Sequence, residues 1–261
     1  MARRQGVHLM LATALTPDTR RQPWVAELLR EVRTSATFHE RRDAMLRGLL
    51  DALCAGNVDT LLIKGAALSH THYPEPYMRH RVDIDLLVRR SDVDRAQRVL
   101  ECHGWSRDVE SDAELATGQR HYTKLLGAGG RVERVDLHWR VANPLVFARA
   151  LSFDELHARA VPIPSLGAAA RTLAPADALL LACLHRVAHH AGDTAAPALL
   201  WLTDICLIVE RLDRLERDRF LALAARESLR AVCRDGLGAA AARLDSSACA
   251  HLAASLPPSP R

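Results

Sequence analysis

The sequence predicts an α+β protein in which a small α/β centre is flanked by helices on both sides. Short apolar runs with strand character lie between about residues 60 and 141, and this pattern disappears from about residue 145 onward. Apolar residues recur at helical spacing before and after that centre. The predicted parts are an N-terminal helical segment at 1–58, a core at 59–143, a C-terminal helical domain at 144–255 and a disordered tail at 256–261.

In the first half of the chain the predicted elements follow from local patterns. Apolar spacing indicates two helices within 23–56. The apolar run at 60–63 has β-branched ends and predicts a buried strand. A short helix at 66–73 is expected to stop at Pro74, and Ser91 can cap a helix at about 92–102.

In the second half, strands give way to helices. The segments 121–126 and 131–141 predict two strands, joined as a hairpin by the Gly-rich residues 127–130. Helices are expected at 175–191, 197–212 and 218–243, the first of them starting at a proline.

Composition and charge narrow the class of protein. Of the 261 residues 49% are apolar, and most of these are Ala, Leu and Val, which suits packed helices. No apolar run is long enough to span a membrane, and His8 interrupts the apolar stretch near the N-terminus, so a cytoplasmic protein without membrane contact is predicted. The six cysteines form no CxxC pair, which disfavours zinc-finger sites. A net charge of +4 without a dense basic block makes long nucleic acid an unexpected partner.

The strongest chemical pattern is Val82–Val88, in which acids and aliphatic residues alternate. Residues two apart on a strand point to the same face, so Asp83 and Asp85 are expected to project together while Ile84 and Leu86 pack on the other side. Two carboxylates side by side on a buried strand repel each other and are costly to desolvate. A divalent cation can offset that cost, and Mg²⁺ prefers carboxylate oxygens, water and substrate phosphates.

A third acid has a similar setting. Asp136 lies between Val135 and Leu137 on a predicted strand. If this strand lies beside the first, three carboxylates converge and can hold two metal ions about 4 Å apart, the arrangement used in phosphoryl transfer. Upstream, Lys64 and Gly65 form a strand-to-helix junction, where backbone N–H groups favour an anion.

Several short blocks, in a fixed order, carry more information than the acids alone. They are Leu62–Leu68, Tyr73-Pro74, Arg79, Asp83–Val88 and Val135–Trp139, with a looser continuation at Leu184-His185, His189 and Trp201–Asp204. Together these blocks resemble a bacterial nucleotidyltransferase family of the DNA polymerase β-like superfamily.

The resemblance implies a small mixed sheet with helices on one side and a nucleotidyltransferase core. It implies that Asp83, Asp85 and Asp136 bind two Mg²⁺ ions, with Mn²⁺ as an alternative, and that Asp136 assists deprotonation of the acceptor. The phosphate turn departs from the superfamily, where Gly-Ser or Gly-Gly is common, and this leaves open a donor other than an ordinary NTP. The residues expected to bind the nucleotide are Lys64, Gly65, Ala66 and Arg79.

Other polar residues are candidates for substrate contact. On its strand His138 shares the face of Asp136, and Lys124 and His121 lie on the neighbouring hairpin strand. On a predicted helix, His185 and His189 share a face and are candidates for substrate contact or metal binding, although no HExxH-like acid accompanies them.

The leading functional hypothesis is Mg²⁺-dependent transfer of a nucleoside monophosphate from an NTP, with ATP weakly favoured, to a hydroxyl of a small-molecule, peptide or protein acceptor. One alternative is a non-catalytic nucleotide-binding or antitoxin-like module, which would bind nucleotide without turnover. Another is a helical metal hydrolase centred on His185, His189 and Asp204.

Overall fold

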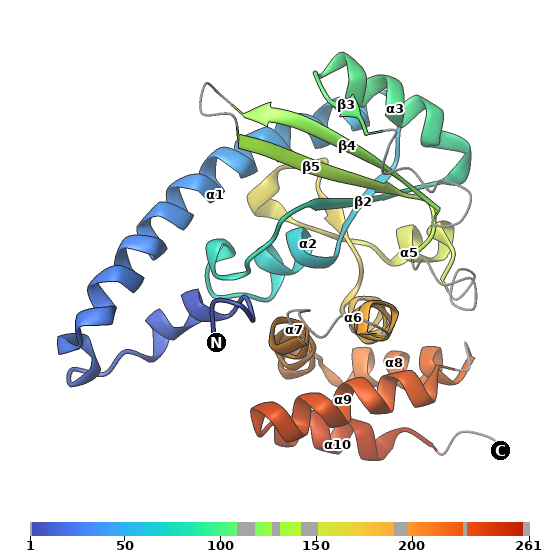
Figure 1. Ribbon diagram of the computed structural model, residues 1–261. Coiled ribbons are helices and arrows are strands. Elements are labelled where there is room, and N and C mark those ends of the chain that lie inside the picture. Colours follow the sequence, from blue (N-terminus) through green and yellow to red (C-terminus); the bar gives the residue numbers. More distant parts are fainter. Residues whose placement is uncertain are drawn as a thin grey trace.

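The structure is a computed structural model that describes residues 2–108, 118–126, 131–141, 151–190, 198–226 and 229–257. Figure 1 shows a twisted sheet with the long helix α1 running along it and the helices α6 to α10 gathered below it. The helices are α1 Pro23–Ala55, α2 Lys64–Thr71, α3 Val93–Cys102, α5 Phe153–Arg159, α6 Pro175–His190, α7 Ala198–Arg211, α8 Arg214–Arg226, α9 Arg230–Leu244 and α10 Ser247–Ser255.

The described strands form one mixed sheet in the order β3-β4-β5-β2-β1-β7-β6. The central strand β2 pairs antiparallel with β1 and parallel with β5, and β5 pairs antiparallel with β4. The mixed α/β fold expected from the sequence is therefore confirmed. The strands are β1 Thr60–Ile63, β2 Ile84–Val88, β3 Ser106–Arg107, β4 Gln119–Leu126, β5 Arg131–His138, β6 Val161–Pro162 and β7 Arg171–Thr172.

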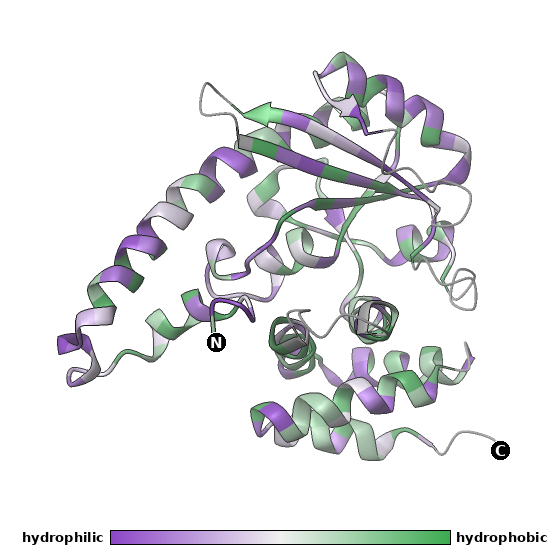
Figure 2. Ribbon diagram, in the orientation of Figure 1, coloured by the Kyte–Doolittle hydropathy of each residue, from purple (hydrophilic) through white to green (hydrophobic). Residues whose placement is uncertain are grey.

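Each face of the sheet packs on its own apolar core. Ile84 and Leu86 of β2 lie in one core with residues of α1 and α3, whereas Leu87 lies in the other with residues of α6 and α7. This follows from the alternation of side chains along a strand, which also directs Asp85 to the face of the helices α6 and α7. Figure 2 shows mainly apolar residues along α10 and alternating polar and apolar residues along α1.

Several elements differ from the predicted ones. Residues 23–55 form one helix, α1, rather than two, because no proline or glycine interrupts its middle. Conversely, the helix predicted at 218–243 is divided between α8 and α9; Leu229, just before α9, is buried in the same core, so the apolar pattern hides the break. The strands β6 and β7 after residue 145 are two residues long each, too short to give a sequence pattern. The helix α3 begins after Asp92, so Ser91 is not its N-cap.

His72, directly after α2, supplies a test of this packing. Its side chain is buried, and burial followed by the nearby Arg211 lowers its pKa to about 4. An unfolded histidine titrates near 6.5, so the unfolded chain binds a proton that the folded chain does not. The contribution of neutral His72 to the free energy of unfolding is therefore complete above about pH 6.5 and decreases as the pH drops toward 4.

As the pH falls from 7 to 5, we expect the resistance of folded His72 to protonation to lower the free energy of unfolding by about 2 kcal/mol. The measurement is urea unfolding at several pH values in the wild type, in His72→Gln and in His251→Gln, a control at an exposed position on α10. His72→Gln should flatten the pH dependence, and His251→Gln should not. Equal slopes in all three proteins would show that His72 does not resist protonation.

Candidate active site

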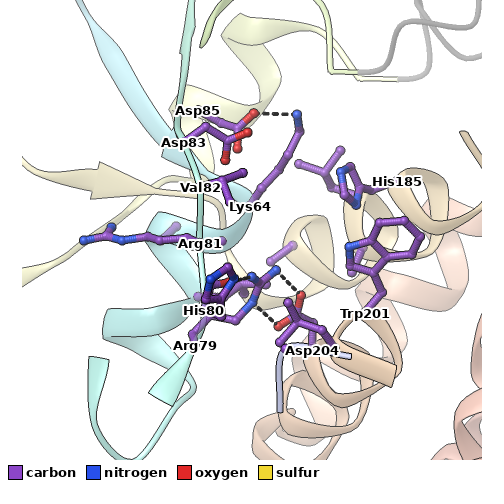
Figure 3. A pocket seen from close by; sticks show the side chains of 18 of the residues that line it. Lys64, Arg79, His80, Arg81, Val82, Asp83, Asp85, His185, Trp201 and Asp204 are labelled. Atoms are coloured by element: carbon purple, nitrogen blue, oxygen red, sulfur yellow. Dashed lines mark hydrogen bonds and ion pairs between the residues drawn. The ribbon is translucent and has the colours of Figure 1, made fainter. Parts of the chain in front are cut away.

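A cavity of about 450 Å³ lies between the sheet and the helices α6 and α7. The start of α2 and the acidic segment before and within β2 form one side, and His185, Leu200 and Trp201 form the other. Figure 3 shows Asp83 and Asp85 directed into this space from the sheet, opposite His185 and Trp201.

Strand pairing brings the acids together. The parallel strands β2 and β5 are in register with Asp85 opposite Asp136, so both carboxylates lie on the cavity face. Asp83 is just outside β2, one residue before its start, and lines the same cavity. Metal-ligating atoms of Asp85, Asp136 and His138 all lie within 4.8 Å of one another.

Asp85 has two close partners. Lys64 Nζ donates to its Oδ1 at 2.6 Å, and His138 Nε2 lies 2.9 Å from the same oxygen. Burial alone would raise the pKa of Asp85, but Lys64 and then His138 hold it well below its usual range. Burial disfavours the charged ammonium of Lys64, yet Asp85 raises its pKa. The pair is therefore ionised at neutral pH.

Asp83 shows that the cluster carries an excess of negative charge. Burial, followed by the charges of Asp85 and Asp136, raises its pKa to about 7. A bound cation would favour ionised Asp83 and relieve this repulsion. Asp136 is oriented by His121, whose Nδ1 lies 2.8 Å from its Oδ1.

The predicted phosphate turn stands at the edge of the same cavity. Lys64, the first residue of α2, adopts a left-handed φ of 53°, a conformation that non-glycine residues rarely keep unless their surroundings hold it. Gly65 lies so close to Arg79 that a Cβ added at Gly65 would come within 3.2 Å of Arg79 Nη1. Ala66 packs in the core on the opposite face of the sheet.

Residues 1–245 match the model of the family described as uncharacterised nucleotidyltransferase. The chain belongs to this family. An aligned solved structure, described as an antigenic nucleotidyltransferase-like protein from Paracoccidioides brasiliensis, is 14% identical, covers 74% of this chain and 91% of that one, and has a TM-score of 0.41. No curated protein shows a significant sequence match. The family resemblance seen in the sequence is thus confirmed, and it supports a general role in nucleotidyl transfer.

Arg79 joins the sheet to the helices. Its Nε and Nη2 donate to the two carboxylate oxygens of Asp204 on α7, at 2.8 and 2.7 Å, and Tyr73 Oη donates to Oδ1 at 2.7 Å. All three side chains are buried. Arg79 lines the cavity, but these bonds to Asp204 occupy two of its three guanidinium nitrogens.

The other predicted contact residues lie in different places. His138 is buried beside Asp85, and His185 lines the helical wall with its ring edge-on to Trp201 at 5.3 Å. Lys124 lies away from the cavity and donates to the carbonyl of His103 at 2.6 Å. The side chain of His189 lies outside the part of the chain that the structure describes.

Several cavity residues were absent from the sequence-based prediction, among them Arg3, Arg4 and Gln119. The N-terminal segment that carries the two arginines is held by Gln5 Oε1, which accepts a bond from the backbone N–H of Leu199 at 3.0 Å, and by Arg3, which pairs with Glu27 on α1. The basic pair near the N-terminus was visible in the sequence, but nothing local linked it to α7. Gln119 lines the cavity from β4. It lies two residues before His121 on the same strand, so the hairpin register would have placed both side chains on one face. Among the described residues, no helix combines the length and apolar character required to cross a membrane.

Proposed function

We propose that the protein transfers a nucleoside monophosphate from an NTP to a hydroxyl of a small-molecule, peptide or protein acceptor, using divalent cations. Support comes from the acids of two parallel strands that share one cavity face, together with membership of the nucleotidyltransferase family. Asp83, Asp85 and Asp136 would hold the cations, with Mg²⁺ as the first expectation. ATP is the first donor to test.

Two features of the structure indicate that Asp83, Asp85 and Asp136 suit divalent cations. Burial, followed by repulsion from Asp85 and Asp136, raises the pKa of Asp83, and Lys64 already places a positive charge beside Asp85. When bound, divalent cations would neutralise charge on the triphosphate and the attacking and leaving oxygens. The N-terminus of α2 would bind phosphate oxygens through its free N–H groups.

The proposed reaction balances without a further reactant. The acceptor oxygen forms a bond to the α-phosphorus, the bond from that phosphorus to the bridging oxygen breaks, and pyrophosphate leaves with the electron pair. We propose Asp136 as the group that takes the hydroxyl proton, because its contact with His121 fixes its orientation. Positioning and charge stabilisation would supply most of the rate enhancement.

The decisive experiment uses ATP labelled at either the α- or the γ-phosphate, with Mg²⁺ or Mn²⁺ and an extract that contains acceptors. Nucleotidyl transfer labels an acceptor from α-labelled ATP only, and pyrophosphate appears in equal amount. If neither label is transferred, the other NTPs follow. Nucleotide binding without any transfer, in a folded protein with all three acids intact, would favour a binding module instead.

Divalent cations are also expected to stabilise the fold. At a hundred times the dissociation constant a ligand adds about 2.7 kcal/mol, which corresponds to roughly 5–10 °C in melting temperature for a chain of this size. Thermal unfolding with Mg²⁺ or Mn²⁺, reversed by EDTA, measures this shift. The double variant Asp85→Asn/Asp136→Asn should lose it, whereas Asp218→Asn on α8, an exposed carboxylate, should keep it. A shift that survives in the double variant would place the cations elsewhere.

A further inference from the structure

We propose that His138 is a nitrogen ligand of the metal ion held by Asp85 and Asp136, so that this position selects Mn²⁺ over Mg²⁺, and that Lys64 competes with the metal for Asp85. This inference rests on the proposed function, because it concerns the same metal cluster. It goes beyond the carboxylate set implied by the sequence.

The register of the sheet places His138 in the cluster. On β5 it is two residues after Asp136, so both side chains leave the same face, and Asp85 on β2 pairs with Asp136. His138 Nε2 lies 2.9 Å from Asp85 Oδ1. Neighbouring ligands of one ion lie about 3 Å apart when the metal–ligand bonds are about 2.2 Å long and perpendicular. The imidazole and the carboxylate thus already have the spacing of two ligands of one metal.

The other nitrogen of His138 can take the ring proton when a metal binds. Without metal, Nε2 donates to the ionised Asp85, so metal ligation by Nε2 requires the ring proton to move to Nδ1. Nδ1 is buried and has no hydrogen-bond partner among the described residues, so no other donor occupies the position that this proton takes. The side chain is 2% exposed, so bulk water does not saturate Nε2.

The ammonium group of Lys64 lies at the position proposed for the metal ion. Its Nζ lies 2.6 Å from Asp85 Oδ1 and 3.4 Å from His138 Nε2, so one ammonium group contacts both proposed ligands. A metal ion bound by the same two atoms cannot share this position with the ammonium. Metal binding must therefore move Lys64 away from Asp85, and the freed ammonium lies at the phosphate turn, where it can contact the triphosphate.

The donor set decides the choice of ion. Mg²⁺ binds almost wholly through oxygen, whereas transition ions also accept imidazole, and among them Mn²⁺ is the one that prefers carboxylate and water oxygens. Two carboxylates and one imidazole, completed by phosphate oxygens, suit Mn²⁺. We expect Mn²⁺ to bind at least about tenfold more tightly than Mg²⁺ at this position.

The test is pulsed EPR of Mn²⁺ added to the full chain, with affinities from the signal of free Mn²⁺. Wild-type protein should show coupling of bound Mn²⁺ to an imidazole nitrogen. His138→Gln should lose this coupling and bind Mn²⁺ at least about tenfold more weakly, with little change for Mg²⁺. The matched control His185→Gln, in the same cavity but outside the cluster, should keep the coupling. Lys64→Met should bind Mn²⁺ more tightly and nucleotide more weakly.

The outcomes separate this inference from the proposed function. Mn²⁺ that binds the wild type without nitrogen coupling, but is lost in Asp85→Asn, would overturn the role of His138 and leave the carboxylate site in place. Unchanged Mn²⁺ affinity in Lys64→Met would overturn the competition by Lys64. If no cation binds to the wild type at millimolar concentration, with or without nucleotide, both the inference and the proposed function are wrong. Circular dichroism of each variant distinguishes loss of binding from loss of folding.

Discussion

Asp85→Asn is expected to lower the rate of nucleotidyl transfer by at least about 10²–10³-fold, the loss typical when one charge-stabilising group leaves a preorganised site. Asp85 is central because its Oδ1 contacts both Lys64 and His138 and its strand neighbour is Asp136. Asparagine keeps the size of the side chain but removes the charge, so a cation loses a ligand and Lys64 loses its ion pair.

The measurement is single-turnover transfer from α-labelled ATP, or from the NTP that proves active, at saturating Mg²⁺ and at saturating Mn²⁺. The control is Asp218→Asn, which removes a carboxylate of α8 that is exposed to solvent. A folded Asp85→Asn protein that retains wild-type transfer would contradict the proposed site. A loss that excess Mn²⁺ restores would instead indicate weakened metal binding with the chemistry intact.

The second large effect concerns stability. Asp204→Asn is expected to reduce the free energy of unfolding by about 3–5 kcal/mol, because it leaves the buried Arg79 without its counter-charge. Chemical denaturation of the wild type and the variant measures this loss. The exposed pair Arg214–Asp218 offers a matched comparison, since its atoms are 4.0 Å apart and Asp218→Asn should change stability by less than about 1 kcal/mol.

Replacing both partners separates the charge from the packing. In Arg79→Met/Asp204→Leu neither charge of this buried pair remains. We therefore expect the double variant to recover most of the stability that Asp204→Asn loses, although Tyr73 loses its acceptor. A double variant as unstable as Asp204→Asn would mean that the ion pair itself, rather than the orphaned guanidinium, carries the stability. Equal stability of the wild type and Asp204→Asn would refute the argument altogether.

The sequence predicted the parts of the site that depend on local pattern. The alternation in Val82–Val88 placed Asp85 and Leu86 on opposite faces, and the structure has them so. It also predicted the strand that carries Asp136, but the alignment of Asp136 with Asp85 depends on the pairing of β2 with β5, which no local pattern specifies. The role of Lys64 was predicted only as a phosphate contact, because its ion pair with Asp85 joins the start of α2 to β2, which are far apart in the sequence.

Tertiary contacts account for what the sequence could not provide. Arg79 was expected at the phosphates, yet its partner Asp204 is 125 residues away on α7. The first residues gave no interpretable pattern, since distant elements hold them: Arg3 pairs with Glu27 on α1, and Gly6 packs against Leu200 on α7. Likewise α1 continues through a stretch in which the apolar spacing weakens, because no proline or glycine interrupts residues 33–44 and the buried Arg42 donates to Glu133 on β5.

The bond between Gln5 and Leu199 joins positions 194 residues apart and ties the early part of the chain to the start of α7 beside the cavity. A change at Arg3, Arg4 or Gly6 therefore alters the edge of the cavity as directly as a substitution in α7 does. A comparison of two variants in α2 or β2 requires that both carry these early residues unaltered.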